Sequence, residues 1–108
     1  MEIKTKSYTL RTDSGQWLAQ IVLTSDGMFA SVTDYGNLSF AWRHTSEKDF
    51  RMFLVEINID YFAVKMYSGA SYVCNSRKTE KACNRFAEKI FPALQQALIE
   101  DIEKNKEW

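Results

Sequence analysis

The chain has few of the residues that build metal centres, disulfide frameworks or hydrolytic sites. Its 108 residues include two cysteines, one histidine, one proline and four glycines. A structural zinc site needs about four nitrogen or sulfur ligands, and Cys74, Cys83 and His44 together supply too few. We therefore expect no metal site, and we interpret both cysteines as free thiols in a reducing compartment.

The sequence also lacks a catalytic or cofactor-binding motif. Its glycines are isolated turn residues, and none begins a G-x-G-x-x-G or P-loop pattern. His44 is expected in a loop, where a single histidine is more often a surface residue than a catalytic base. We expect no enzyme activity and no cofactor.

Long apolar runs and an excess of charge are missing as well. No stretch approaches the roughly 18 consecutive apolar residues of a membrane-spanning helix, and the polar start is no secretory signal. Fourteen Lys and Arg balance fourteen Asp and Glu, which excludes the strong global field of a DNA-coating or membrane-surface protein. We expect a cytoplasmic protein without membrane contact, whose electrostatic recognition is local.

The chain does contain enough apolar residues, 45% of the total with 14% aromatic, for the single core of a domain spanning 1–108. Turn signals divide residues 1–43 into four runs rich in β-forming residues. These signals are Asp13-Ser14-Gly15, Ser25-Asp26-Gly27 and Asp34-Tyr35-Gly36-Asn37. The predicted antiparallel meander has strands at about 3–11, 17–24, 28–34 and 38–43.

Alternation of polar and apolar residues assigns two faces to this sheet. The inward set is Tyr8, Leu10, Trp17, Ala19, Ile21, Leu23, Met28, Ala30, Val32, Leu38, Phe40 and Trp42. The outward set is polar apart from Leu18, Val22 and Phe29. A protein partner, a homodimer, or cover by residues 70–76 or the C-terminal tail would each explain these three apolar residues.

Helical periodicity begins after the meander. Ser46, followed by acidic residues, predicts an N-cap, and 46–67 is expected to form one kinked helix or two short ones. A C-terminal helix is predicted over 77–104, with a kink near Pro92, and the polar tail 103–108 should fray. The predicted fold class is α+β, a four-stranded antiparallel β-meander followed by two or three helices packed on one face. Its predicted core is Trp17, Ile21, Val32, Phe40, Phe53, Leu54, Phe86, Ile90 and Leu94.

Basic residues recur at steps of four along the first turns of the C-terminal helix. They are Arg77, Lys81, Arg85 and Lys89, with Lys78 beside them. Acids stabilise a helix start and bases its end, so this order opposes the helix dipole. The strip is either a solvated face or a binding site for phosphates or for an acidic patch of a partner.

A second candidate surface combines the outer side of the sheet with the third turn. Exposed apolar and aromatic groups beside an arginine are typical of interface anchors. The members of this set are Leu18, Val22, Phe29, Tyr35, Asn37 and Arg43.

Three short segments carry a resemblance to small proteins encoded by bacteriophages and prophages. The resemblance spans about residues 7–67, and turn residues and core aromatics account for most of it. It implies a bacterial host cytosol and a protein that obstructs a host machine, as anti-CRISPR and other anti-defence proteins do. The segments are Ser25-Asp26-Gly27-Met28-Phe29-Ala30-Ser31-Val32-Thr33-Asp34-Tyr35-Gly36-Asn37, Ser39-Phe40-Ala41-Trp42-Arg43 and Asp49-Phe50-Arg51.

The leading hypothesis is a non-enzymatic inhibitor that contacts a host protein or ribonucleoprotein complex, with homodimerisation as an open alternative. The second is a nucleic-acid-binding module that uses the basic residues of the C-terminal helix. The predicted partner-binding residues are Phe29, Tyr35, Asn37, Arg43, Arg77, Lys78, Lys81, Arg85 and Lys89.

Overall fold

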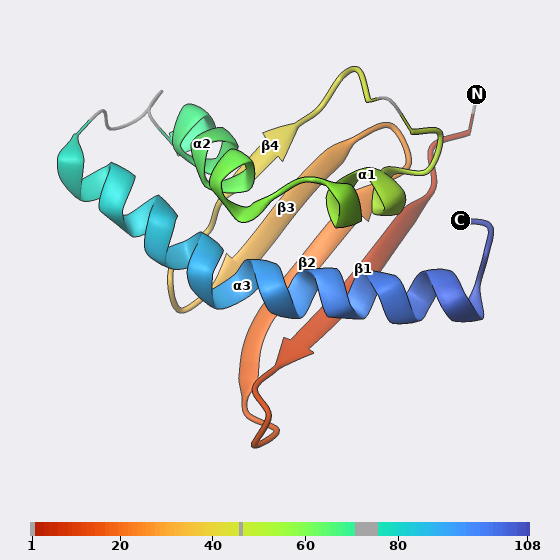
Figure 1. Cartoon of the computed structure of the whole chain (residues 1–108), viewed down its shortest axis with the longest axis horizontal. Helices are drawn as coiled ribbons and strands as arrows, with labels where there is room; N and C mark the ends of the chain where they lie inside the picture. The colour runs from red at the N-terminus through yellow and green to blue at the C-terminus, as the bar shows by residue number, and fades with distance from the viewer. Residues whose placement is uncertain (1, 46, 71–75) are drawn as a thin grey trace.

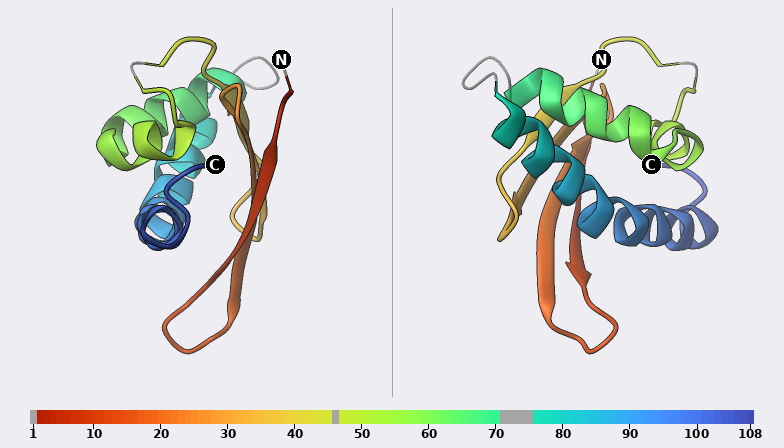
Figure 2. Two further views of the ribbon diagram at one scale, coloured as in Figure 1. Left: turned by 90° about the vertical axis from the view of Figure 1, so that its right-hand side faces the viewer. Right: turned by 60° about the vertical axis from the view of Figure 1, so that its left-hand side comes forward.

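The computed structural model describes residues 2–45, 47–70 and 76–108. Its four strands form one antiparallel sheet in the order β1-β2-β3-β4, and three helices follow. All three helices lie on the same face of the sheet, as Figures 1 and 2 show. The predicted α+β fold is therefore confirmed. The elements are β1 (Thr5–Arg11), β2 (Trp17–Thr24), β3 (Met28–Thr33), β4 (Ser39–Ala41), α1 (Phe50–Glu56), α2 (Ile59–Ala70) and α3 (Arg77–Lys104).

Two short helices occupy the segment that follows the sheet. Asp49 caps α1, because its Oδ1 accepts a hydrogen bond from the backbone N–H of Arg51 at 2.9 Å. The predicted cap at Ser46 is wrong, and Ser46 itself lies outside the described residues. Asn58 separates the helices, and its side chain accepts from the N–H of Tyr61 in the first turn of α2 at 2.8 Å.

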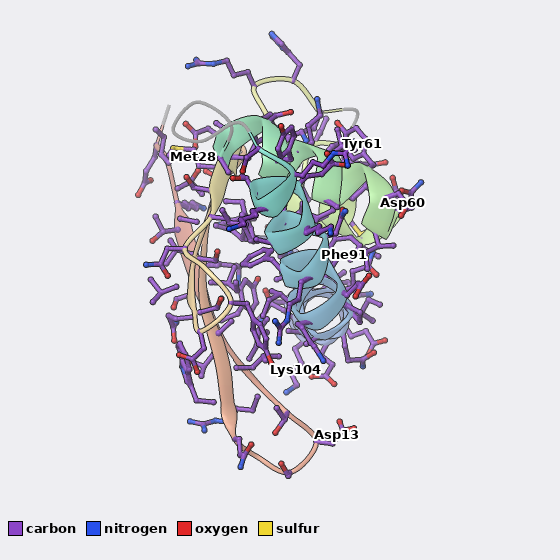
Figure 3. All side chains as sticks on the ribbon, turned by 90° about the vertical axis from the view of Figure 1, so that its left-hand side faces the viewer. Asp13, Met28, Asp60, Tyr61, Phe91 and Lys104 are labelled. Carbon is purple, nitrogen blue, oxygen red and sulfur yellow. The ribbon has the colours of Figure 1, made fainter. Side chains whose placement is uncertain are left out.

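The long helix α3 forms one wall of the molecule. The Ser76 hydroxyl caps it by accepting from the N–H of Thr79 at 3.2 Å. The helix contains Pro92 and changes direction near its middle, while the β1–β2 hairpin extends past it with Asp13 near its tip (Figures 1 and 3). Its apolar stripe faces the sheet and is buried at Cys83, Phe86, Ala87, Ile90, Phe91, Leu94 and Leu98.

The core between sheet and helices is built around Phe62 of α2. Its ring lies 5.4 Å from that of Phe29 on β3 and 4.5 Å from that of Phe91 on α3, measured between centroids. These aromatic contacts join the sheet to both α2 and α3. The predicted core residues Ile21, Leu54, Phe86, Ile90 and Leu94 are fully buried, and Phe40 and Phe53 are partly buried against them.

The predicted face of β3 is wrong. Phe29 is 0% exposed, whereas Met28 is 49% and Val32 55% exposed. Leu23 pairs with Phe29 and Ile21 with Ser31, so odd-numbered residues of both strands share the inner face. The inner face tolerates Ser31 because its hydroxyl donates to the carbonyl of Leu38 at 2.8 Å.

Two other predicted positions also differ in the structure. Trp17 is 40% exposed, at the point where the pairing of β1 and β2 shifts between Leu10 and Arg11. Leu18, expected on the outer face, is partly buried against the core instead, while Val22 is exposed as predicted.

The C-terminal tail packs against the protein, contrary to the prediction that it frays. The guanidinium of Arg51 lies 5.8 Å from the ring centroid of Trp108, and its Nη2 donates to the carbonyl of Lys106 at 3.5 Å. Trp108 is partly buried against the core. The tail therefore lies at the helix layer and does not cover the outer side of the sheet, where Figure 2 shows no helix.

Candidate functional site

The basic side chains of α3 form an exposed strip, hereafter the α3 strip. All five of its members are exposed to solvent. In the described part of the chain the only ion pairs are those of Arg51 with Asp49 and of Lys6 and Arg51 with Asp101, so no member of the strip has an ion-pair partner there. These cations are available to an anionic ligand. The α3 strip comprises Arg77, Lys78, Lys81, Arg85 and Lys89.

The turn between β3 and β4 places Tyr35 beside the strip. Thr33 holds this turn, because its hydroxyl donates to the carbonyl of Gly36 and accepts from the N–H of Tyr35, both at 2.8 Å. Gly36 adopts a φ of 129°, which favours glycine at this point of the turn. The turn is thus fixed by its own hydrogen bonds, and the ring of Tyr35 is held half-buried against the core.

Arg85 and Tyr35 form a cation–π pair. The guanidinium carbon of Arg85 lies 5.4 Å from the centroid of the Tyr35 ring. At this distance the positive charge is attracted by the negative face of the ring. The contact orients a cation of the α3 strip without neutralising its charge.

Three hollows meet at Tyr35 and together form a groove along one side of α3, hereafter the Tyr35 groove. Their volumes are about 330 Å³ next to Lys78, about 380 Å³ next to Lys81 and Arg85, and about 670 Å³ next to Lys89. Tyr35 lines all three of them. The third hollow lies between α3 and the β1–β2 hairpin, since Arg11 and Asp13 also line it.

The charge of the groove changes along its length. Lys78, Lys81 and Arg85 line the two hollows near the start of α3. Asp34 is the one acid that lines these two hollows. The far hollow, beside the hairpin, is mixed in charge, because Arg11 and Lys89 line it together with Asp13, Glu88 and Glu100. Cations outnumber acids in the two hollows near the helix start but not in the far hollow, so an anionic ligand should prefer the part nearer the helix start.

Comparison with known proteins identifies the origin of the chain. A model described as a phage family matches residues 1–84 of the 108-residue chain. The protein belongs to this phage family. No curated protein and no solved structure matches the chain. The matched residues include the β3–β4 turn and the first two turns of α3, and the remainder of the α3 strip follows them.

The structure of the phage protein brings most of the predicted partner-binding residues together and separates the others. Tyr35 joins the α3 strip, as described above. Phe29 cannot be a contact residue, because it lies on the inner face of the sheet and is fully buried. Asn37 is exposed, but its Oδ1 accepts from the N–H of Thr33 at 3.2 Å and so supports the turn. Arg43 lies in a separate hollow of about 360 Å³ with His44 and Lys48.

The sequence did not predict that the β1–β2 hairpin lines one side of the groove. Arg11 lines the largest hollow together with Lys89, although the two residues lie far apart in the sequence. No periodicity links a strand end to a helix, so only the tertiary structure reveals this pair. Leu18, interpreted as an outer-face anchor, lines the same hollow from β2.

The outer side of the sheet carries a few exposed apolar residues. Val22, Met28 and Val32 are exposed there, and Val22 pairs with Ala30 across the ladder. Figure 3 labels Met28 near the end of the sheet opposite to Asp13. Residues 70–76 were one candidate for covering this side, and 71–75 of them lie outside the described residues.

The residues considered for chemistry are not brought together among the described residues, although Cys83 lines the hollow next to Lys78. His44 is exposed near the end of β4. Cys83 is buried on α3, and burial raises the pKa of its thiol; Cys74 lies outside the described residues. No group of three metal-ligating side chains occurs within the described ranges. No helix among the described residues is long and apolar enough to cross a bilayer.

Proposed function

We propose that this phage protein is a non-enzymatic binding protein that inhibits a host defence complex, as anti-CRISPR proteins do. Its contact surface is the Tyr35 groove together with the α3 strip. The observation that carries the proposal is the presence of five exposed cations on α3 with no ion-pair partner among the described residues. Membership of a phage family supplies the biological setting.

The placement of these cations does not serve the stability of α3. A base in the first turn of a helix is unfavourable by about 0.3–1 kcal/mol at an exposed site, because the helix N-terminus carries a partial positive charge. Arg77 and Lys78 occupy that turn, and Glu80 is the one acid there. A surface that keeps such charges in the helix start is consistent with selection for binding.

The partner that fits this surface is an anionic part of a host protein or ribonucleoprotein complex. Exposed cations attract such a partner over distances of about 10 Å at moderate salt and so raise the association rate. Tyr35 and Arg85 belong to residue types that are enriched in binding hot spots. The surface thus combines steering charges with an anchored aromatic group.

Phage plating on a defended host tests this proposal. The protein is expressed in a bacterial strain that carries the defence system and, as a reference, in the same strain without it. We expect the wild-type protein to restore plating on the defended strain, and Lys81→Glu with Arg85→Glu to abolish that effect. Lys4→Glu with Lys48→Glu is the matched control, because both lysines are exposed and lie outside the groove. Equal restoration by the strip variant would remove the α3 strip from the proposal.

A further inference from the structure

We infer that the Tyr35 groove binds single-stranded nucleic acid, with phosphates on the α3 strip and a base stacked on the Tyr35–Arg85 pair. The inference rests on the proposed function, because it specifies the chemical component of the host complex that the surface contacts. Three features carry it: the spacing of the cations, the aromatic–guanidinium pair, and the hollow shape of the groove.

The cations of the α3 strip suit a chain of phosphates. Arg77, Lys81, Arg85 and Lys89 follow at steps of four residues, which places their Cα atoms about 6 Å apart along the helix axis. The strip is therefore about 18 Å long, enough for a few nucleotides. The strip has five cations, and the acids near it are Glu80 and Glu88 on the same helix and Asp34 beside Tyr35, so a net positive charge remains to attract phosphates.

The Tyr35–Arg85 pair provides the platform that a base requires. Single-stranded nucleic acids bind by stacking exposed bases on aromatic rings or on arginine guanidinium planes. Tyr35 is held in a hydrogen-bonded turn and packed against the core, so little freedom is lost when a base stacks on the pair. A poly-glutamate segment would use the cations but has no aromatic ring to stack on this pair.

The groove favours a single strand over a duplex. It is bounded on one side by the β3–β4 turn and the hairpin, and the apolar residues Leu18, Pro92 and Ala93 line its far hollow. An extended strand can lie in such a groove with bases turned toward the protein, whereas the bases of a duplex are stacked inside its phosphate backbones. In the far hollow the acids Asp13, Glu88 and Glu100 offset the cations Arg11 and Lys89, so phosphates should bind more favourably in the two hollows nearer the helix start.

Fluorescence anisotropy with labelled oligo(dT) and oligo(U) of about ten nucleotides tests the inference directly. We expect both oligonucleotides to bind, and affinity to fall with salt with a slope of about 0.7 for each phosphate contact. Lys81→Gln with Arg85→Gln should lower that slope by about 1.4. Tyr35→Ala should weaken binding about fivefold or more with the slope unchanged, and Tyr35→Phe should retain binding.

Matched variants keep the test decisive. Arg85→Lys retains the charge but removes the guanidinium plane, so it should weaken binding without changing the slope, even if Tyr35→Ala proves unstable. Lys65 lies 5.4 Å from the Tyr61 ring, the same distance as in the Tyr35–Arg85 pair, but on α2. Lys65→Gln is therefore the control, and it should leave binding unchanged.

Different outcomes would overturn the inference and the proposed function separately. The inference fails if neither oligonucleotide binds, if a duplex of equal length binds as tightly, or if a poly-glutamate peptide binds equally well without dependence on Tyr35. The proposed function would survive each of these results, provided that the strip variant still loses its effect in the plating assay. If the strip variant retains that effect while oligonucleotides bind, the proposed function fails and the nucleic-acid site stands.

Discussion

The buried guanidinium of Arg51 donates a hydrogen bond from Nη1 to Oδ2 of Asp101 at 2.9 Å, although fifty positions separate the two residues. The same carboxylate oxygen accepts from the Tyr8 hydroxyl at 2.6 Å and lies 3.2 Å from Nζ of Lys6. One carboxylate on α3 thus connects α1 with β1. The network holds the end of α3 in place, and with it the helix that carries the proposed binding surface.

Removing Arg51 should destabilise the protein far more than removing Lys6, although both pair with Asp101. The Arg51 side chain is fully buried, and Arg51→Met leaves the partly buried carboxylates of Asp49 and Asp101 without their main partner. We expect a loss of about 3 kcal/mol in unfolding free energy. Lys6 is partly exposed, so Lys6→Met should cost less than about 1 kcal/mol. Urea unfolding followed by circular dichroism measures both, and equal losses would contradict the assigned role of Arg51.

The Asp101 network should make stability depend on acidic pH. Burial alone would raise the pKa of Asp101, but hydrogen bonds from Tyr8, Asn105, Arg51 and Lys6 outweigh it and hold that pKa well below its ordinary value. Below about pH 4 the unfolded chain therefore binds a proton at this carboxyl that the folded protein does not bind. The network should make its whole contribution to the unfolding free energy above about pH 4, and this contribution should decrease as the pH falls further.

Asp101→Asn isolates this contribution from that of the other carboxylates. The variant should be less stable than the wild type at pH 7, and its stability should fall less steeply between about pH 4 and pH 2. Thermal or urea unfolding over this range measures the difference. Parallel loss of stability in the two proteins would show that Asp101 does not carry the acid dependence.

The face of β3 can be tested with one inner and one outer residue. Phe29→Ala should lower the unfolding free energy by about 3–5 kcal/mol, because it opens a cavity beside Phe62 in the core. Val32 is exposed on β3, an inner strand of the sheet. Val32→Thr should therefore change the unfolding free energy by no more than about 0.5 kcal/mol. A large effect at Val32 together with a small one at Phe29 would reverse the face assignment.

The error in β3 shows what an alternating pattern cannot decide. Met28, Ala30 and Val32 are apolar at alternate positions, so the pattern favours them as the inner set. The register depends on the turn between β2 and β3, where the pairing of Leu23 with Phe29 leaves residues 24–28 in the connection. Phe29, Ser31 and Thr33 occupy the inner face instead, and both hydroxyl groups form hydrogen bonds there. The polarity of the residues does not reveal the turn geometry that places them inside.

Long-range pairs account for the other differences between prediction and structure. The polar composition of the C-terminal tail led to the prediction that the tail frays. Trp108 packs instead beside Arg51, a residue from the start of α1. Helical spacing was sufficient to predict the α3 strip, since residues four apart share one face. It could not place Tyr35 against Arg85, because that contact depends on how the sheet and α3 pack against each other.

The most direct test of the account is the effect of the α3 strip on partner binding. Tagged wild-type protein, Lys81→Glu with Arg85→Glu, and the control Lys4→Glu with Lys48→Glu are used to capture partners from lysate of the defended host, with and without nuclease. All three proteins should melt at nearly the same temperature, because these side chains are exposed and none has an ion-pair partner within the described ranges. We predict that the strip variant alone loses the defence complex. Undiminished capture of that complex by a folded strip variant would contradict the assignment of this surface.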